Sequence, residues 1–321
     1  SQVVSSTFIK STNLLGQTKT INIGNGYTID FLWVEPGTFQ MGSPSSELER
    51  SVNETLHSVT LTQGFWLGKY EITQGQWKTI MNSNPSQFKL GDNYPVDQVS
   101  WNDITNNFLP TINSKNLDSG IFRLPTEAEW EFACRANNQN AYYWGTRIND
   151  EYCWHSGNSD NSTHQAGQKK PNAWGFYDMT GNVWEWCNDW YSSTYYTQSP
   201  STNPPGPTSG TSHVLRGGGW PAGEASSRSA YRMSSATTSS GIGFRLVFST
   251  KMEKTETPLI NPTGSSFTSS QQITLSCATP DATIKYTLDG STPTATNGIT
   301  YISPFTISSS VTIKVIAFKN G

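Results

Sequence analysis

Hydrophobic and polar positions alternate with a period of two along much of the chain, which predicts a sheet of short strands. Residues 21–41 alternate well enough for two or three strands, with a Pro-Gly turn at 36–37. Residues 59–61 and 65–67 predict two further strands. In residues 183–186, tryptophan alternates with valine and glutamate, so this strand should have one buried face and one mixed face.

Two helices are expected in the next part of the chain. Thr73 and Gln76 have the spacing of a capping box, which predicts a helix over about residues 74–81. Ser100 is the expected cap of a second helix, and Pro110 should kink or break it. The apolar positions that share one face of this second helix are Trp101, Ile104, Phe108 and Ile112.

A third short helix should begin at another capping box. Thr126 and Glu129 form this box, and the helix should extend through Cys134. Arg123 lies just before it and is expected to pair with an acid such as Glu127 or Glu131.

Composition favours a loop-rich globular protein with two domains. The chain has 321 residues, 34% of them hydrophobic and 14% charged, with 27 glycines and 12 tryptophans. A net charge of −3 without a basic stripe gives no electrostatic case for a nucleic-acid partner. No run of eighteen apolar residues is present, so no membrane span is expected. The chain begins Ser-Gln-Val-Val without Met, as a processed or engineered start would, and we expect an extracellular or cell-surface protein.

The four cysteines, Cys134, Cys153, Cys187 and Cys277, lie far apart in the sequence. The absence of a C-x-x-C pair excludes an ordinary zinc ribbon or a thioredoxin-like motif. A Cys153–Cys187 bridge is one interpretation, but its geometry cannot be derived from spacing. Buried free thiols are the other, and we favour it.

Seven sequence blocks follow one another in a distinctive order: Gly37–Ser43, Tyr70–Trp77, Pro95–Trp101, Arg123–Glu131, Tyr177–Trp186, Leu215–Trp220 and Gly241–Arg245. Their order and spacing resemble the formylglycine-generating-enzyme (sulfatase-modifying factor) family over residues 31–247. The resemblance implies an α+β fold, that family's loop-rich variant of the C-type lectin fold with short twisted strands and two or three helices. It does not by itself define an activity.

The catalytic chemistry of the resembled enzymes depends on a pair of cysteines between the Arg-Gly-Gly block and Gly-Phe-Arg. This pair binds copper and oxidises a substrate cysteine, because soft thiolates select a cuprous ion. Residues 220–240 contain no cysteine and no histidine here, and Met233 alone is a poor copper site. The family also often pairs a cysteine after Gly-Phe-Arg with one at the position of Cys134, but Leu246 stands there. We therefore predict no copper and no enzyme activity of this kind.

A calcium site is the metal site that the sequence predicts. Asp178 and Glu185 flank a Gly-Asn turn, and two carboxylates with turn carbonyls are ligands that calcium prefers. An aromatic-rich core strand with two solvated acids is the alternative interpretation of the same residues. The family's calcium-binding turn maps onto this stretch, whereas a second calcium site of the family is not matched around Cys153, so one ion is expected. The ligands would be Asp178, Met179, Gly181, Val183 and Glu185.

The segment that lacks the cysteine pair has the residue types of an adaptable binding surface. Small residues surround Trp220, Tyr231 and Met233, and Arg228 and Arg232 belong to an Arg-Ser-Ala-Tyr-Arg run. This frame resembles the variable region of diversity-generating-retroelement proteins, in which exposed positions are randomised on a fixed lectin-type scaffold. The predicted ligand-binding residues are Trp220, Pro221, Ala222, Gly223, Ser226, Tyr231, Met233, Ser234, Ser235 and Ala236.

Further expectations and one alternative accompany this predicted surface. Such variable regions usually end a protein, but here a second module follows. Tyr231 should face outward, Trp220 is balanced between core and surface, and the Tyr-rich loop 191–212 should assist binding. A featureless surface loop of an inactive paralogue is the alternative interpretation.

The chain is expected to divide into an N-terminal arm (1–20), the lectin-like domain (21–248), a polar linker (249–257) and a second domain (258–321). Tyr286–Pro293 resembles the chitobiase/hexosaminidase C-terminal module, an immunoglobulin-like all-β sandwich. The chain stops directly after a strand, where that module usually continues, so we expect this domain to be incomplete.

The function expected from these features is noncatalytic binding of an unknown protein or carbohydrate. The alternative is a metal-dependent oxidase or hydroxylase of the same superfamily, with His155 or His164 among its ligands.

Overall fold

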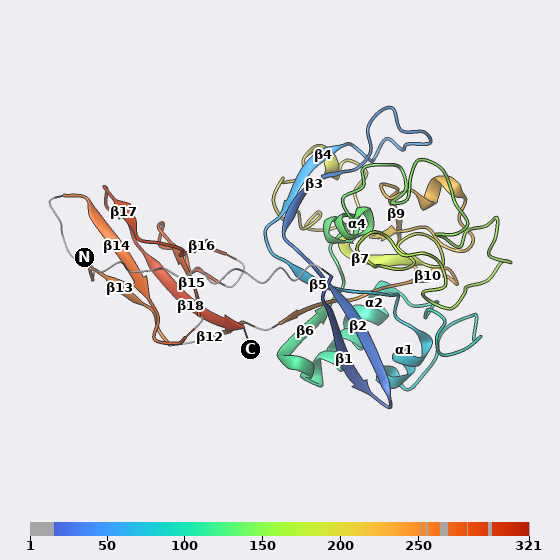
Figure 1. The fold of residues 1–321 in the computed structure, drawn as a ribbon, viewed down its shortest axis with the longest axis horizontal. Coiled ribbons are helices and arrows are strands. Elements are labelled where there is room, and N and C mark those ends of the chain that lie inside the picture. The colour runs from blue at the N-terminus through green and yellow to red at the C-terminus, as the bar shows by residue number, and fades with distance from the viewer. Residues whose placement is uncertain are drawn as a thin grey trace, which may run out of the picture. The chain divides into compact units, whose positions relative to one another are not determined.

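The computed structural model describes residues 16–250, 252–254, 256–263, 269–280, 282–294 and 297–320. These separate into two compact units, with the division between Ser249 and Thr250 (Figure 1). Most of the predicted arm lies outside the described residues, but its end, Thr18–Thr20, belongs to the first strand. The predicted linker 249–257 is partly in strands, because it contains the end of one strand at Thr250 and a second strand at Met252–Lys254.

The first unit contains two sheets and a hairpin. The larger sheet has the order β1-β2-β5-β11-β6, with β1 Thr18–Gly24, β2 Tyr27–Val34, β5 Phe65–Gly68, β11 Val247–Thr250 and β6 Gly120–Arg123. The second sheet has the order β10-β7-β8-β9, with β10 Ile242–Gly243, β7 Trp184–Trp190, β8 His213–Arg216 and β9 Met233–Ser235. Strands β3 Gly37–Met41 and β4 His57–Leu61 form the hairpin.

The helices begin where their capping residues predict. Both capping boxes are present, at Thr73 for α1 (Gln74–Met81) and at Thr126 for α4 (Glu127–Arg135). The helix capped by Ser100 is continuous through α2 (Trp101–Asp103), the π-helical η1 (Ile104–Phe108) and α3 (Leu109–Ser114). Pro110 lies in the first turn of α3, where a helix tolerates proline. The wider π-helical turn η1 directly before it stands where the kink or break was expected. Short 3-10 turns are η2 Leu117–Ser119, η3 Tyr195–Thr197 and η4 Glu224–Ser227.

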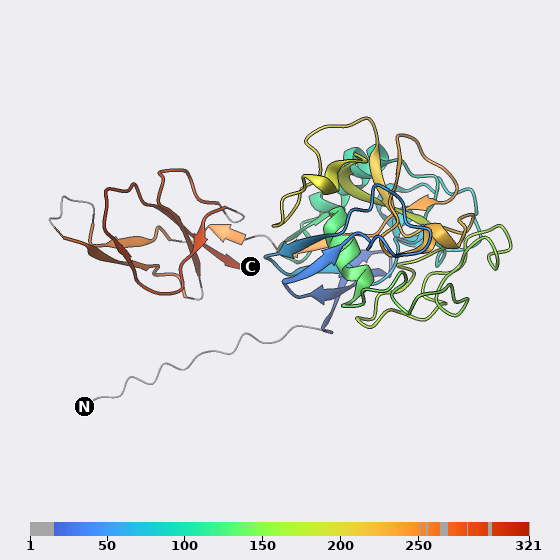
Figure 2. The same ribbon diagram turned by 90° about the horizontal axis from the view of Figure 1, so that it is seen from above.

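Two hydrophobic clusters cover the two faces of the second sheet. Trp184, Trp186 and Leu215 point into the first cluster, together with the buried side of α1 and η1. Cys187 and Val214 point into the second, which also contains the apolar residues of α4. Figure 2 shows α4 beside the β3–β4 hairpin. Phe132 of α4 packs against Phe39 of β3, with their ring centres 5.0 Å apart. The tryptophan alternation thus places β7 between two cores.

Helix α4 carries acids on opposite sides, and this corrects one predicted ion pair. Arg123 pairs with Glu129, with nitrogen–oxygen distances of 2.7 Å, and not with Glu127 or Glu131. The latter two are four residues apart, so they share the interior face of the helix and meet other arginines there.

The second unit is an all-β sandwich. One sheet has the order β12-β18-β15-β16, with β12 Met252–Lys254, β18 Lys314–Asn320, β15 Thr283–Thr287 and β16 Ile299–Thr300. The other has the order β13-β14-β17, with β13 Leu259–Asn261, β14 Gln271–Ser276 and β17 Phe305–Ile307. The expected fold class of both units is confirmed. Among the described residues, no helix has the length and apolar content needed to cross a bilayer.

Candidate functional site

The turn at Gly181-Asn182 holds the start of the predicted ligand segment. Gly181 N–H donates to the Gly217 carbonyl at 2.9 Å, and Trp220 N–H donates to the Asn182 carbonyl at 2.7 Å. Gly181 has φ +86°, and a Cβ added there would lie 2.2 Å from the Trp154 carbonyl oxygen. Only glycine therefore fits this position. The sequence stretch with the two tryptophans and the segment after Arg-Gly-Gly form one structural unit.

Arg228 ties the middle of the segment to the β3–β4 loop. Its guanidinium donates to Glu47 at 2.7 Å and to both carboxylate oxygens of Glu54 at 2.8 Å. A further bond reaches the Glu49 carbonyl at 2.9 Å. Arg228 is buried, and burial works against its charge, but the two acids raise the pKa of its guanidinium. This arginine is a structural support and does not reach the surface.

Arg232 ties the same segment to α4. Its Nε and Nη2 donate to the two carboxylate oxygens of Glu127 at 2.7 and 2.6 Å. The guanidinium lies 3.9 Å above the centre of the Tyr196 ring and donates to the carbonyls of Asn53 and Ser192. The last two residues of the Arg-Ser-Ala-Tyr-Arg run therefore point in opposite directions, with Tyr231 half-buried and Arg232 buried.

After this run the segment continues as β9. It pairs with β8 in register, with Met233 opposite Leu215 and Ser235 opposite His213. Since side chains alternate along a strand, Met233 and Ser235 share the face of Leu215, whereas Ser234 lies on the other face. Strand β9 is the last in its sheet order, so all three of its residues remain half-exposed.

The predicted ligand-binding residues differ in exposure. Pro221, Gly223 and Ala236 are exposed, and Trp220, Ser226, Tyr231, Met233, Ser234 and Ser235 are half-buried. Ala222 is a correction, because it is buried with the first core cluster and its methyl group does not face solvent.

The two aromatic residues of the segment both lie at the boundary of core and surface. Trp220 meets the Phe88 ring edge-on at 5.4 Å and donates from Nε1 to the Ser240 carbonyl. Tyr231 is tilted against Trp184 at 5.9 Å. Each ring has one side supported and keeps an exposed part, which is an arrangement suited to a binding anchor.

The Tyr-rich loop 191–212 does not present its central tyrosines to a ligand. Tyr195 and Tyr196 are buried in the second core cluster. Tyr196 lies under the Arg232 guanidinium, and the Tyr195 hydroxyl accepts a bond from Gly206 N–H at 3.1 Å. This loop therefore supports the segment from below.

The predicted calcium turn contains a buried cluster of acids around one arginine. Glu185 accepts two bonds from Arg245 at 2.7 Å and one from Trp130 Nε1 at 2.9 Å. Asp178 accepts from Gly167 N–H through one oxygen, and its other oxygen has no hydrogen-bond partner.

These contacts fit a calcium ion only in part. As placed, Glu185 is occupied by Arg245, and the Met179 carbonyl accepts a weak bond from the Cys134 thiol at 3.7 Å. No group of three or more acid, thiol or imidazole side chains among the described residues is arranged to hold a metal. In favour of a cation, Glu71, Asp178 and Glu185 are all buried near a single guanidinium. Burial raises the pKa of Asp178 to about 6, as expected for a carboxylate that lacks a full counter-charge.

The histidines of the alternative enzyme hypothesis are used in hydrogen bonds. His155 Nδ1 accepts from Gly157 N–H at 3.2 Å, which places the proton on Nε2, 2.9 Å from Asp150. His164 Nε2 lies 2.9 Å from the Ser159 carbonyl, and its ring stacks on Trp154 at 3.6 Å. These contacts leave His155 no free nitrogen for a metal.

The Cys153–Cys187 bridge is not formed. Cys187 points from β7 into the second core cluster, whereas the Cys153 thiol lies 3.8 Å from the Asn149 carbonyl. Both are buried free thiols, as is Cys134. Burial raises the pKa of the Cys153 thiol to about 12, so it is unreactive at neutral pH.

With this geometry established, comparison with known proteins assigns the family. A sulfatase-modifying factor enzyme 1-like domain matches residues 25–250, and a chitobiase/beta-hexosaminidase C-terminal domain matches residues 262–321. The chain belongs to the sulfatase-modifying factor enzyme 1-like family. The resemblances to this family and to the chitobiase/hexosaminidase C-terminal module are thereby confirmed.

Related proteins include enzymes and a protein described as a chaperone. Chaperone protein LppX of Paenibacillus barcinonensis is 34% identical over 240 residues, covering 60% of this chain and 78% of LppX. The formylglycine-generating enzyme of Streptomyces coelicolor is 39% identical over 142 residues, covering 40% of this chain and 42% of the enzyme. The match thus spans less than half of that enzyme.

Two solved structures have the same fold. Treponema denticola variable protein 1 superposes with a TM-score of 0.63 at 27% identity and covers 72% of this chain and 98% of its own. PvdO from Pseudomonas aeruginosa gives a TM-score of 0.64 at 25% identity with the same coverage. The proteins similar to this chain therefore include both enzymes and a variable protein, and the activity of this chain has to be argued from its own residues.

Proposed function

We propose that this protein binds a ligand without catalysis and that the ligand contacts residues 220–236 on the lectin-type scaffold. The observation that carries the proposal is that some side chains of this segment hold its backbone in place, whereas others remain partly exposed. Buried Arg228 and Arg232 fix its backbone, so the half-buried Tyr231 and Met233 can vary in chemistry without loss of the support. A rigid backbone that presents aromatic and small polar side chains lowers the entropy cost of binding.

Two similarities support the noncatalytic reading. Treponema denticola variable protein 1 shares the fold, and the relative LppX is named a chaperone. The segment also lacks the cysteines that a copper-dependent oxidase needs. Calcium at the Asp178 turn would stiffen the start of the segment, and we propose it as a structural ion. An extracellular or cell-surface location stays a prediction.

The proposal is tested by an activity assay and a binding screen on the whole chain. Incubation with a cysteine-containing sulfatase peptide and copper should give no formylglycine above the protein-free control. Glycan and protein arrays should then be probed with the unmodified protein and with Tyr231→Ala.

Loss of an aromatic anchor should weaken capture by about thirtyfold, the effect of a 2 kcal/mol hot spot. Tyr94→Ala, which removes a half-buried tyrosine of another loop, is the matched control and should bind normally. Formylglycine product, or hits that bind Tyr231→Ala as well as the unmodified protein, would contradict the proposal.

A further inference from the structure

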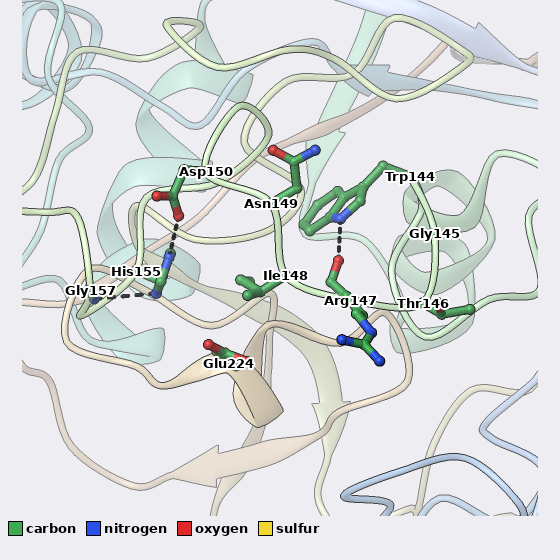
Figure 3. A pocket seen from close by; sticks show the side chains of 10 residues that line it. All are labelled: Trp144, Gly145, Thr146, Arg147, Ile148, Asn149, Asp150, His155, Gly157 and Glu224. Carbon is green, nitrogen blue, oxygen red and sulfur yellow. Dashed lines mark hydrogen bonds and ion pairs between the residues drawn. The ribbon is translucent and has the colours of Figure 1, made fainter.

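A hollow of about 770 Å³ opens beside the start of the ligand segment (Figure 3). Its walls come from the loop 144–157 and from η4, the 3-10 turn within the segment. The side chains that define its chemistry are Trp144, Arg147, Ile148, Asp150, His155 and Glu224.

The loop side of the hollow is held in shape by its own hydrogen bonds. Tyr142 and Gly145 exchange backbone bonds of 2.9 and 3.0 Å, and Trp144 Nε1 donates to the Arg147 carbonyl at 2.8 Å. The Trp144 ring stacks on Tyr142 at 5.0 Å and on Tyr152 at 5.1 Å. The hollow is therefore preformed, which favours binding because little order has to be gained.

Further bonds join the loop to the ligand segment. The Tyr142 hydroxyl donates to the Glu224 carbonyl at 3.1 Å, and Ser156 N–H donates to the Ala222 carbonyl at 2.9 Å. Glu224 lies between Gly223 and Ser226, two of the predicted ligand positions. The hollow is thus continuous with the proposed surface, and Glu224 belongs to both.

Charged groups of both signs face the hollow, and two of them, Arg147 and Glu224, have no ion-pair partner among the described residues. Both side chains are exposed. Asp150 uses one oxygen for His155 Nε2 at 2.9 Å and keeps the other. Figure 3 shows Ile148 between Arg147 and Asp150, so one apolar side chain lies between these two opposite charges.

We propose that this hollow is a subsite for a polypeptide segment that presents a basic side chain to Glu224 and Asp150 and an acidic side chain to Arg147. The Ile148 side chain would contact the stem between those charges. A neutral saccharide offers no charge to match either side, and a phosphate backbone would meet two carboxylates. The inference deepens the proposed function and rests on it, since it assigns a polypeptide to the ligand of that surface.

The test uses acetylated and amidated tripeptides as probes, added to the whole chain and followed by NMR chemical-shift titration at low salt. The mixed-charge peptides Lys-Gly-Glu and Glu-Gly-Lys should bind, one more tightly than the other because the hollow has a direction. Lys-Gly-Lys, Glu-Gly-Glu and maltotriose should bind more weakly than the better mixed peptide.

Charge-removing variants locate the binding. Arg147→Gln and Glu224→Gln should each weaken the better peptide by about two- to fivefold, the range for one exposed ion pair. Glu151→Gln is the matched control, because Glu151 pairs with Lys170 at 2.9 Å and does not line the hollow. This variant should bind the better peptide as tightly as the unmodified protein does.

Other results would overturn the inference. These are equal binding of peptides with one sign of charge, tighter binding of maltotriose, or affinities unaffected by both variants. Tyr231 does not line the hollow, so these titrations do not test the proposed aromatic anchor. A failed peptide titration therefore leaves the ligand surface at Tyr231 to be judged by its own screen.

Discussion

Arg232 should be much more important for stability than its neighbour Tyr231, although both lie in the proposed binding segment. The informative change is Arg232→Met, which keeps the length of the side chain and removes its charge. It would leave Glu127 buried without its two bonds of 2.6 and 2.7 Å and would remove the cation above the Tyr196 ring.

The magnitude follows from the contacts that remain. Removing one partner of a buried ion pair costs about 3–5 kcal/mol. Arg216 Nη1 stays 3.7 Å from Glu127 and offsets part of this loss, so the lower end of that range, about 3 kcal/mol, is expected. Tyr231→Ala removes a half-buried ring whose hydroxyl makes no hydrogen bond within the described part of the chain, so a loss of about 1 kcal/mol is expected.

Urea unfolding followed by tryptophan fluorescence measures both effects in the intact chain. All 12 tryptophans lie before residue 221, so the signal reports only the first unit. Lys115→Met, at an exposed lysine, is the control for the change in composition. A loss for Arg232→Met no larger than that for Tyr231→Ala would refute the assignment of Arg232 as a support.

The pH dependence of the Arg232→Met deficit gives an independent check. Burial alone would raise the pKa of Glu127, but Arg232 and Arg216 hold it below its usual value. Without Arg232 the effect of burial grows, and the pKa of Glu127 in the folded variant rises. The folded variant then retains a proton that the unfolded chain has lost, so its deficit should be smaller at pH 5 than at pH 8. Glu127→Gln combined with Arg232→Met should recover part of the loss.

Two further predictions concern other buried acids. If calcium binds at Asp178, about 1 mM calcium should raise the melting temperature of the EDTA-treated protein, and Asp178→Asn should abolish the rise; equal melting temperatures with calcium and EDTA would count against the site. Burial, and then the Glu127 charge, raises the pKa of Asp189 to about 8 from an ordinary 3.8. The folded state then holds a proton that the unfolded state loses, so stability should fall by up to about 1.4 kcal/mol per pH unit between about pH 4 and 8. Asp189→Asn should flatten this part of the curve, and a curve identical to that of the unmodified protein would exclude Asp189 as its source.

Local signals in the sequence account for the parts of the structure that were predicted. A capping box needs only residues three apart, and both boxes start helices where expected. The alternation around Trp184 likewise predicts which side chains enter the core, because side-chain direction in a strand follows from position alone. Such rules act over a few residues, so they survive without knowledge of the tertiary fold.

Charge partners were not predictable in the same way. Arg232 and Glu127 are 105 residues apart, and the pairing of Arg123 with Glu129 depends on which side of α4 faces the core. The Arg-Ser-Ala-Tyr-Arg run did offer one usable signal. If its arginines are buried, each needs an acid close by to offset the loss of hydration. That requirement was the available signal, since Glu127 and Glu131 occupy one face of a helix.

Burial of small residues was equally hidden from the sequence. Ala222 belongs to a stretch of small residues typical of a loop, and both of its sequence neighbours are exposed, yet its side chain packs in the first core cluster. The hollow beside Glu224 depends on loops without periodic pattern, so no local rule places its walls.

The arrangement of supports explains how one scaffold can present different surfaces. The backbone of residues 220–236 is fixed by contacts that point inward, from Gly181 and Asn182 at its start and from Arg228 and Arg232 in its middle. Substitutions at the exposed positions would therefore change the surface while the free energy of unfolding stays nearly constant. The same logic removes Ala222 from the positions free to vary, because a larger side chain there would overpack the core. Residues 220–236 can therefore accept new side chains only at positions whose present side chains neither hold the backbone in place nor pack in the core.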